Sequence, residues 1–481
     1  MAPHDVQLFP RNGAGVGSAP FRLKAGQRTM KTMAIWAVVV WAACTSWVLA
    51  DDWPQWMGLN RDDIWNETGI LEKFPAGGPK ILWRAPIGAG YAGPAVAGGK
   101  VFVLDHLLAQ GTEAAKNAFD RSVVPGKERI LCLNQANGKT LWMHEYDCPY
   151  GISYGSGPRT TPLIADGKVY TLGAEGNLLC LNADKDEVIW SHEFKKELAV
   201  TSPMWGFAAS PLLDGKKLIS LARGPGTTVM AFDKDSGKEI WRALTAAEPG
   251  YAPPVIYDLN GKRQLIIWHP EAVNGLDPET GKVYWTQPFK SNNGLSVSMP
   301  RATKLADGSD GLFVTAFYNG AMMLKFEKGK EQPEVLWRGE KMSERNTDTL
   351  HSIIPTPFIE NGYIYGVCSY GQFRCLKAET GERVWESFIP TGGPYEQKEG
   401  VRWANAFIIK NGDRFFLPNE KGDLIIAKLS EKGYEEISRA HILEPDNKLP
   451  GRPVNWSHPA FSGKCMVARN DHEIVDVFLG K

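Results

Sequence analysis

A segment that ends in tryptophan and recurs along the chain constrains the fold more than any other feature of the sequence. Six copies, 44 to 52 residues apart, end at Trp142, Trp190, Trp241, Trp285, Trp337 and Trp385. In most copies a turn-forming glycine stands four residues before the tryptophan, as in NGKTLW, SGKEIW and TGERVW. A period of this length indicates a repeat architecture in which each unit packs against its neighbours.

The units also begin alike, with a short apolar run, a glycine-containing turn and a run rich in β-branched residues. Examples are GPAVAGGKVFVL from residue 93, TPLIADGKVYTL from residue 161 and TPFIENGYIYGV from residue 356. Asp-Gly and Asn-Gly favour two-residue hairpin turns. A third run such as LLCLN and the tryptophan run complete four short strands, which is typical of a propeller blade rather than of a helical repeat.

The number of units predicts a closed ring. Seven units end near residues 147, 194, 245, 289, 339, 388 and 440. The C-terminal segment has the beginning and middle of a unit but no tryptophan run, whereas residues 79–88 (PKILWRAPIG) are a tryptophan run alone. The sequence therefore predicts an all-β, eight-bladed β-propeller of four-stranded blades, closed by joining the N- and C-terminal strands around Trp83. Such closure leaves no open sheet edge.

The repeated tryptophans and cysteines are predicted to be structural. We expect the tryptophans to be buried between blades, at Trp142, Trp190, Trp241, Trp285 and Trp385. Cysteines recur at one position of the third strand and are expected to be small buried residues: Cys132, Cys180 and Cys375. There is no CxxC or CxxCH motif, so a zinc ribbon or a c-type haem is not indicated.

Residues 1–50 have the layout of a secretory signal. Five basic residues and one acid precede an apolar run from Met33 to Cys44, and Val48 and Ala50 form a small-residue pair before Asp51. The run is short for a membrane helix, although an uncleaved anchor, a lipidated Cys44 and a later start codon remain alternatives. We expect a signal peptide region at 1–50, a leader segment at 51–78 and the propeller at 79–481. The predicted location is the periplasm or cell envelope, with no membrane span after signal cleavage.

The charge balance argues against nucleic acid as a partner. The chain has 54 basic and 54 acidic residues, so it has no basic excess to bind a polyanion.

The tryptophan runs resemble the repeats of the pyrroloquinoline-quinone-like (PQQ-like) propeller family, and the resemblance covers residues 79–481. The segment DDWPQWMGLNRDDIWNETG (51–69) is similar to the Trp-Pro-x-Trp-x-Gly-x-x-Arg segment that opens many exported members. The family includes quinoprotein alcohol and sugar dehydrogenases, and also non-catalytic scaffolds such as the propeller lipoprotein of the barrel-assembly machine. The resemblance therefore implies the fold strongly and the function weakly.

In the dehydrogenase branch, the resemblance implies PQQ stacked between a tryptophan and a vicinal disulfide, with a Ca²⁺ ion bound by Glu, Asn and Asp and an aspartate as general base. This chain has no adjacent pair of cysteines. The first hypothesis is therefore a non-catalytic binding or scaffold module, and the alternative is a quinoprotein-type oxidoreductase that uses PQQ with Ca²⁺.

Candidate binding residues come from a geometric argument. The first strand of a blade is innermost, so the residues just before it line one mouth of the channel. Aligned on the repeat, these residues are Tyr91, Arg159, Trp205, Tyr251, Arg301, His351, Arg402 or Trp403, and Trp456 or His458. Aromatic and arginine side chains stack planar or sugar-like ligands and neutralise a carboxylate. We expect Arg159, Arg301 and Arg402 to converge there, unless these side chains only fill the channel.

The ring of candidates predicts a protein partner, or a small anionic or carbohydrate-like ligand, on one face of the propeller. A second feature is an insertion at 110–128 (QGTEAAKNAFDRSVVPGKE) between the second and third strands of the first unit. We expect it to form a short surface helix or a lid, since long loops are often functional.

Overall fold

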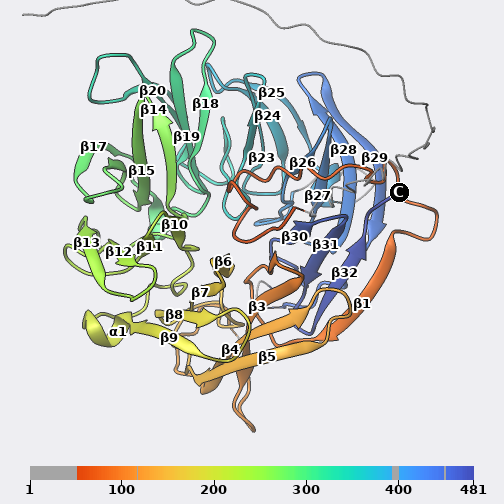
Figure 1. Ribbon diagram of the computed structural model, residues 1–481. Helices are drawn as coiled ribbons and strands as arrows, with labels where there is room; N and C mark the ends of the chain where they lie inside the picture. Colours follow the sequence, from red (N-terminus) through yellow and green to blue (C-terminus); the bar gives the residue numbers. More distant parts are fainter. Residues whose placement is uncertain (1–50, 116, 393–399, 449–450) are drawn as a thin grey trace, which may run out of the picture. The chain divides into compact units, whose positions relative to one another are not determined.

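The computed structural model describes residues 51–115, 117–392, 400–448 and 451–481. The signal peptide predicted at 1–50 lies outside the described residues. The described chain folds into eight four-stranded antiparallel sheets that form the blades of one β-propeller (Figure 1). The predicted fold class is confirmed.

The strands of the first four blades follow the chain from the inner to the outer strand. Blade 1 contains β2 (Ala95–Ala97), β3 (Lys100–Leu108), β4 (Gly126–Asn134) and β5 (Thr140–Asp147). Blade 2 contains β6 (Leu163–Ala165), β7 (Lys168–Leu172), β8 (Asn177–Asn182) and β9 (Val188–Glu193). Blade 3 contains β10 (Leu212–Asp214), β11 (Lys217–Leu221), β12 (Val229–Asp233) and β13 (Glu239–Ala243). Blade 4 contains β14 (Val255–Leu259), β15 (Lys262–His269), β16 (Ala272–Leu276) and β17 (Val283–Pro288).

The remaining blades repeat this order, except that the outer strand of blade 8 comes from the N-terminal end. Blade 5 contains β18 (Arg301–Lys304), β19 (Asp310–Ala316), β20 (Gly320–Phe326) and β21 (Glu334–Arg338). Blade 6 contains β22 (Phe358–Glu360), β23 (Tyr363–Val367), β24 (Phe373–Lys377) and β25 (Arg383–Ser387). Blade 7 contains β26 (Ile409–Asn411), β27 (Arg414–Pro418), β28 (Asp423–Ser430) and β29 (Gly433–His441). Blade 8 contains β30 (Ala460–Ser462), β31 (Cys465–Arg469), β32 (Glu473–Phe478) and β1 (Lys80–Pro86).

Blade 8 closes the ring as predicted. Strand β1 pairs antiparallel with β32, and Trp83 lies opposite Asp476. Because the two ends of the propeller share one sheet, β32 is not left as an unpaired outer edge and blade 8 has four strands like the others.

Hairpin turns between the first and second strands follow the predicted Asp-Gly and Asn-Gly signals. At Asp166-Gly167 the φ angles are 50° and 71°, and at Asn361-Gly362 they are 52° and 79°. Positive φ at both central residues is the type I′ geometry, which matches the twist of the strands. These turns therefore fix the register of the inner strands.

Most of the repeated tryptophans join neighbouring blades. The indole N–H of Trp190 donates to the carbonyl of Lys234 at 3.0 Å, and that of Trp142 donates to Ala183 at 3.2 Å, in each case in the next blade. The prediction of burial is confirmed for Trp142, Trp190, Trp241 and Trp285. Trp385 is only half-buried.

Trp285 differs from the others because its indole N–H donates within its own blade, to Gln264 at 2.6 Å. Its ring lies across Gly275, the residue that pairs with it on the neighbouring strand. The next blade has no Asp-x-x-Gly turn after its third strand to accept the indole.

The cysteines have the predicted role. In blades 1, 2 and 6 the residue opposite the tryptophan is Cys132, Cys180 and Cys375 respectively, and each is fully buried. The described cysteines are all free thiols.

Helical structure in the described residues is limited to two single turns, α1 (Phe194–Glu197) and α2 (Ile389–Gly392), and a 3₁₀ turn, η1 (Asn292–Gly294). None of the helices in the described ranges has the length and apolar character needed to span a membrane. The helix that was one expectation for the blade 1 insertion is absent from its described residues, where Val124 pairs with Tyr150 of the next loop instead.

The leader, residues 51–78, reaches the middle of the ring (Figure 1). Trp53 exchanges two backbone hydrogen bonds with Val96 of β2, and the carbonyl of Pro54 accepts the N–H of Ile164 in β6. Farther along, the carbonyl of Asp63 accepts the N–H of Lys410 in β26. The leader therefore touches inner strands on several sides of the channel.

The Trp-Pro-x-Trp-x-Gly-x-x-Arg residues explain how the leader is held. Gly58 has a φ of +82°, and a Cβ there would lie 2.9 Å from the ring of Trp53. The buried guanidinium of Arg61 donates to the carbonyl of Pro211 at 2.8 Å and to that of Ser210 at 3.2 Å. Gly58 is thus required by its conformation and its contact with Trp53, and Arg61 by its hydrogen bonds to the segment before β10.

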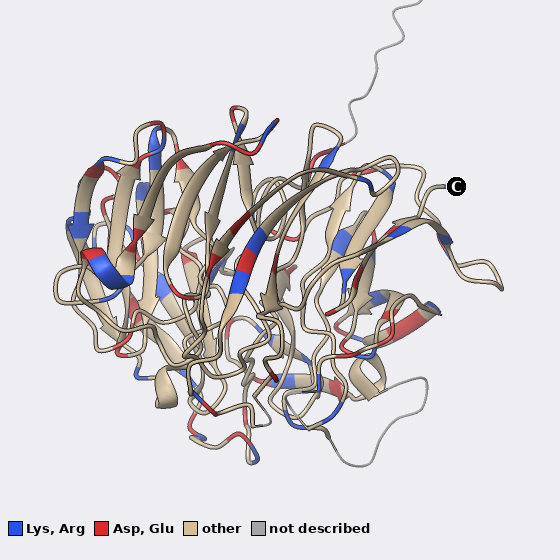
Figure 2. Cartoon of the chain, turned by 90° about the horizontal axis from the view of Figure 1, so that it is seen from below, with Lys and Arg blue, Asp and Glu red and all other residues tan. Residues whose placement is uncertain are grey.

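Charged side chains are distributed without segregation. Basic and acidic residues alternate over the strands and loops in Figure 2, as expected from the balanced composition.

Candidate functional site

A cavity of about 520 Å³ lies where the segments before the inner strands meet. All eight blades contribute to its lining, and the leader contributes Trp56. Nine lining side chains are aromatic: Trp56, Tyr91, Phe119, Tyr154, Trp205, Tyr251, Tyr318, Trp403 and Trp456. Within the described part of the chain, Arg159 is the one charged residue of the lining. This volume is in the range of small-molecule sites.

Five of the eight residues proposed from the sequence line this cavity: Tyr91, Arg159, Trp205, Tyr251 and Trp456. At the position where the sequence left Arg402 or Trp403 open, Trp403 lines it. At the position left open between Trp456 and His458, His458 is instead buried beside the leader, 3.0 Å from Asp63.

Arg301 lies away from the cavity because the leader binds its side chain. The guanidinium donates to the carbonyls of Arg61 at 3.3 Å and Asp62 at 3.1 Å, and only 8% of the residue is exposed. Leu295 and Val297, which precede it, line the cavity in its place.

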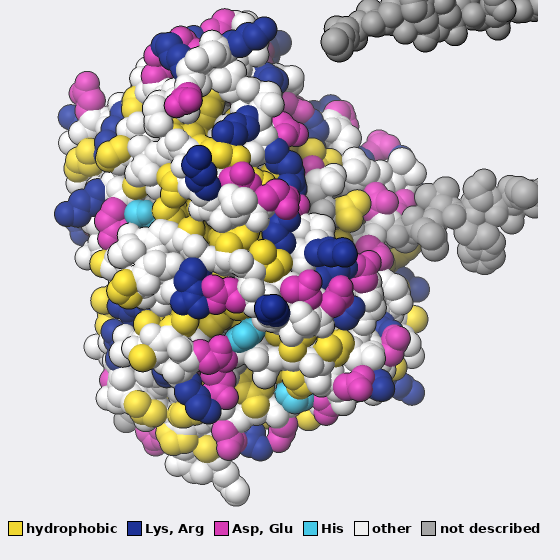
Figure 3. Space-filling model, turned by 60° about the vertical axis from the view of Figure 1, so that its left-hand side comes forward, with side chains coloured by type: hydrophobic (Ala, Val, Ile, Leu, Met, Phe, Trp, Pro, Cys, Tyr) yellow, Lys and Arg dark blue, Asp and Glu magenta, His cyan; other side chains and the backbone are white. Residues whose placement is uncertain are grey.

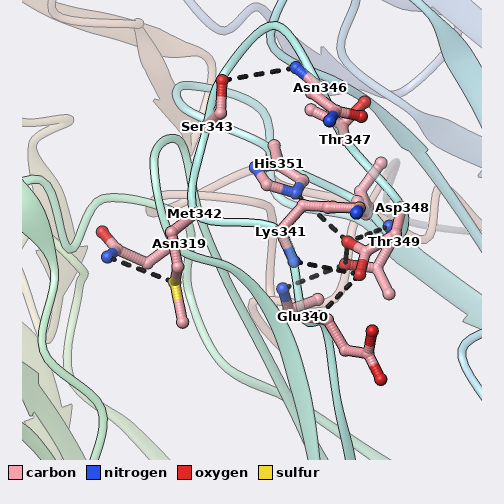
Figure 4. Close-up of polar contacts among 12 residues, drawn as sticks. Asn319, Glu340, Lys341, Met342, Ser343, Asn346, Thr347, Asp348, Thr349 and His351 are labelled. Atoms are coloured by element: carbon pink, nitrogen blue, oxygen red, sulfur yellow. Dashed lines mark hydrogen bonds and ion pairs between the residues drawn. The ribbon is translucent and has the colours of Figure 1, made fainter.

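His351 is fully buried and lies among the residues of the 340–351 loop (Figure 4). Its Nδ1 lies 3.1 Å from the carbonyl of Phe317, and its Nε2 lies 3.6 Å from Oδ1 of Asp348. Burial lowers the pKa of His351. Ile353 and Ile354, two and three residues later, line the cavity instead.

Asp348 holds the loop over His351. Its carboxylate accepts backbone N–H groups from Glu340 at 2.6 Å, Lys341 at 3.1 Å and Thr349 at 2.8 Å (Figure 4). Burial raises the pKa of Asp348, but these N–H donors outweigh it and leave the pKa below its ordinary value. The carboxylate is thus used to organise a loop.

Arg402 is not part of the lining but contacts two residues that are, Tyr318 and Trp403. Its guanidinium pairs with Glu344 at 3.1 Å, donates to the hydroxyl of Tyr318 at 3.1 Å and lies over the ring of Trp403. The three arginines expected to converge therefore do not share this cavity, because the leader engages Arg301 and the 340–351 loop engages Arg402.

Arg159 contributes a positive charge that is already hydrogen-bonded. Its guanidinium donates to the carbonyls of Gly157, Ser153 and Tyr154, and it lies 5.1 Å from the ring centre of Tyr91. No ion pair joins it to a carboxylate of the described residues.

The aromatic residues of the lining contact one another in two groups. In one, Tyr154 stacks on Trp456 with ring centres 6.2 Å apart, and Tyr91 lies 6.4 Å from the same tryptophan. In the other, Trp205 and Tyr251 meet edge to face at 5.6 Å. Both groups present ring surface to the cavity.

An ion pair with a buried carboxylate orients Trp456. Its indole N–H donates to Glu420 at 2.9 Å, and Glu420 pairs with Arg452 at 2.8 Å. Burial raises the pKa of Glu420, although Arg452 opposes this shift. The sequence reasoning did not identify this pair, because Glu420 follows β27 and has no counterpart in the other repeats.

Several other lining residues were missed from the sequence. Trp56 belongs to the leader and Phe119 to the blade 1 insertion, so neither occupies a repeated position. Both segments depart from the repeat, and this departure is the signal in the sequence that points to them.

The residues of this site do not match what PQQ with Ca²⁺ requires. The lining has one guanidinium and no carboxylate. In the described residues, no three His, Cys, Asp or Glu side chains are grouped so that they could hold a metal ion. A multiply anionic cofactor and its cation would therefore lack partners here.

Comparison with known proteins places the chain in a family. The model of one protein family, described as outer membrane protein assembly factor BamB, matches residues 126–387, which is more than half of the chain. A search of curated proteins gave no match.

Solved structures share the fold at low identity. The quinohemoprotein alcohol dehydrogenase of Comamonas testosteroni is 12% identical, with a TM-score of 0.58 over 89% of this chain and 80% of that one. Quinohemoprotein alcohol dehydrogenase ADHIIG of Pseudomonas putida HK5 is 11% identical, with a TM-score of 0.55 and the same coverage. BamB from Moraxella catarrhalis is 16% identical, with a TM-score of 0.48 over 78% of this chain and 97% of that one. Together with the repeat and the closed ring of eight blades, the family match means that the chain belongs to the PQQ-like propeller family described as outer membrane protein assembly factor BamB.

Proposed function

We propose that the protein is a non-catalytic binding propeller that holds an uncharged aromatic group of its ligand in the channel-mouth cavity. The observation that carries this proposal is the composition of the lining, in which nine side chains are aromatic and one is charged. Aromatic walls contribute large contact areas and favourable ring geometry to a bound ring.

The electrostatics favour an uncharged ligand over the anionic alternative. A charged group that enters an apolar cavity loses hydration and must be paired to compensate. Arg159 is the available cation, and three backbone carbonyls already bond it. A sugar would also find few partners, since Asn293 and Ser210 are the lining residues with amide or hydroxyl groups outside the tyrosines.

A protein partner in the cell envelope is consistent with this site. The family description, an outer membrane protein assembly factor, supports a scaffold role and a location outside the cytoplasm. The signal-like composition of residues 1–50 supports export. In such a complex, an aromatic side chain of the partner would be the group that enters the cavity.

The test is a fluorescence titration with N-phenyl-1-naphthylamine, an uncharged aromatic probe that brightens in apolar surroundings. We expect saturable binding of one probe per chain. Trp205→Ala should weaken binding about tenfold, because it removes one ring wall. PQQ with Ca²⁺ should not displace the probe.

The matched control is Ile240→Ala. Ile240 lies on the outer strand β13, is 46% exposed and is not part of the cavity lining. Apolar side chains also lie scattered among charged ones on the surface in Figure 3, so adventitious dye binding must be measured. Equal effects of the two substitutions, or binding that does not saturate, would contradict the proposal.

A further inference from the structure

The second half of the blade 1 insertion, residues 117–125, forms an arm that is tied to the loops of blades 2 and 3. Val124 and Tyr150 exchange two backbone hydrogen bonds of 2.9 Å. Arg121 donates to the carbonyl of Gly151 at 3.2 Å and to that of Ser202 at 3.5 Å. The arm therefore has a fixed position beside the cavity.

Phe119 lies at the outer end of the cavity. Its side chain lines the cavity, yet 54% of the residue is exposed to solvent. It meets the ring of Tyr154 edge to face, with centres 5.4 Å apart. Because more than half of Phe119 is exposed, replacing it should cost the whole fold little beyond the local contact with Tyr154, whereas a ligand that fills the cavity would cover it.

Ala118 supports Tyr154 in an unusual conformation. The backbone N–H of Tyr154 donates to the carbonyl of Ala118 at 2.6 Å, and Tyr154 has a φ of +54°. A bulky residue rarely adopts this left-handed region. The ring that this backbone presents also contacts Trp403 at 6.4 Å and Trp456 at 6.2 Å, both in the lining.

We infer that the arm is a specificity element of the cavity, in which Ala118 fixes Tyr154 and Phe119 contacts the outer end of the ligand. The inference rests on the proposed function and deepens it. Phe119 is the one exposed aromatic residue of the lining in the described part of the chain, whereas Trp56 and Trp205 are half-buried and Tyr251 is buried. Phe119 therefore adds contacts only for a ligand that extends toward solvent. The arm thus selects elongated ligands with more than one ring over single compact ones.

The test compares two uncharged probes of different length. N-phenyl-1-naphthylamine has a phenyl ring that 1-aminonaphthalene lacks. Phe119→Ala should lower the affinity for the longer probe about fivefold, because one ring–ring contact is lost at the outer end. The affinity for the shorter probe should change by less than about twofold. Phe119→Trp should restore the binding of the longer probe.

Val123→Ala is the matched control, because Val123 lies on the same arm, is 69% exposed and is not part of the lining. It should change neither affinity. If Phe119→Ala leaves the ratio of the two affinities unchanged, the arm is not a specificity element, although the proposed function stands. If the longer probe does not bind the unmodified protein, both fail.

Hydrogen exchange provides a readout without a ligand. The amide of Tyr154 should exchange faster in Phe119→Ala than in Val123→Ala, since the packing that seats the Ala118 carbonyl is weakened. Equal protection in the two variants would overturn the positioning of Tyr154 by the arm.

Discussion

Two aromatic residues of the cavity hold their side chains at a cost in backbone free energy. Tyr154 has a φ of +54° and Trp403 a φ of +65°. Such conformations cost about 1–3 kcal/mol each in non-glycine residues and persist where the surroundings enforce them. Backbone N–H groups tie both residues, to the carbonyls of Ala118 and Ser369. These backbone contacts therefore fix the directions in which the Tyr154 and Trp403 rings enter the lining.

A single buried carboxyl is expected to set part of the pH dependence of stability. Asp476 is 1% exposed, and burial raises its pKa to about 6, although the neighbouring Cys465 and Trp83 side chains oppose the shift. Ionised Asp476 therefore destabilises the fold above pH 6, and this loss disappears below the ordinary aspartate pKa of 3.8.

Asp476→Asn should accordingly be more stable than the unmodified protein at pH 8 by up to about 3 kcal/mol. The difference should shrink toward zero at pH 3, where the aspartate is neutral in both the folded and the unfolded chain. Urea unfolding at the two pH values measures this. A variant that is less stable at pH 8 would show that the charged form is the one the fold prefers.

For individual residues, the sequence predicted the position in the ring of blades but not the direction of the side chain. Tyr91, Arg159, Trp205, Tyr251 and Trp456 line the cavity because the repeat fixes their distance from the inner strand. Arg301 and His351 occupy equivalent positions, but non-repeated segments cover them. The repeat contains no information on those segments, so their contacts could not be predicted.

Among the elements, the junction between blades is the recurrent stabilising contact. The outer-strand tryptophan of one blade packs on the turn glycine of the next, as Trp190 does on Gly237. Gly237 has a φ of +71°, and a Cβ there would lie 2.7 Å from the indole. The turn therefore requires glycine for both its conformation and its contact.

Trp190→Ala should lower the free energy of unfolding by about 3–5 kcal/mol, because it leaves a cavity and frees the carbonyl of Lys234. Ile189→Ala is the control, since Ile189 is adjacent and 41% exposed, and it should cost less than about 0.5 kcal/mol. Thermal or urea unfolding of both variants tests this. If both variants lose a similar amount of unfolding free energy, the contact of Trp190 with the next blade does not stabilise the fold.

The repeated strands and turns could be predicted from the sequence, whereas the conformation of the non-repeated insertion could not. Strands, turns and the small cysteines opposite the tryptophans all follow from the repeat. A helix was one expectation for the insertion, and its described residues are not helical but pair with neighbouring loops, as Val124 does with Tyr150. Partners so distant from their own blade leave no local pattern in the sequence.

In the molecule as a whole, the N-terminal region has two separable roles. Strand β1 completes blade 8, and the leader lies against inner strands of several blades. Removing the leader removes contacts, whereas removing β1 opens a sheet edge and the ring itself.

Deleting residues 51–78 should therefore leave a folded propeller of lower stability, and deleting residues 51–88 should abolish a single cooperative unfolding transition. Calorimetry of the two truncated proteins makes this comparison. A protein without residues 51–88 that melts like the one without 51–78 would contradict closure by β1.

The central claim, that the aromatic cavity is the binding site, is tested most directly by photolabelling. The protein is irradiated with 1-azidonaphthalene, an uncharged aryl azide, and the labelled peptides are identified by mass spectrometry. We predict labels at Met204, Trp205, Trp403 and Trp456, and their suppression by excess N-phenyl-1-naphthylamine. Labels concentrated instead on exposed outer-strand residues such as Leu141 and Ile240, and insensitive to the competitor, would contradict the account.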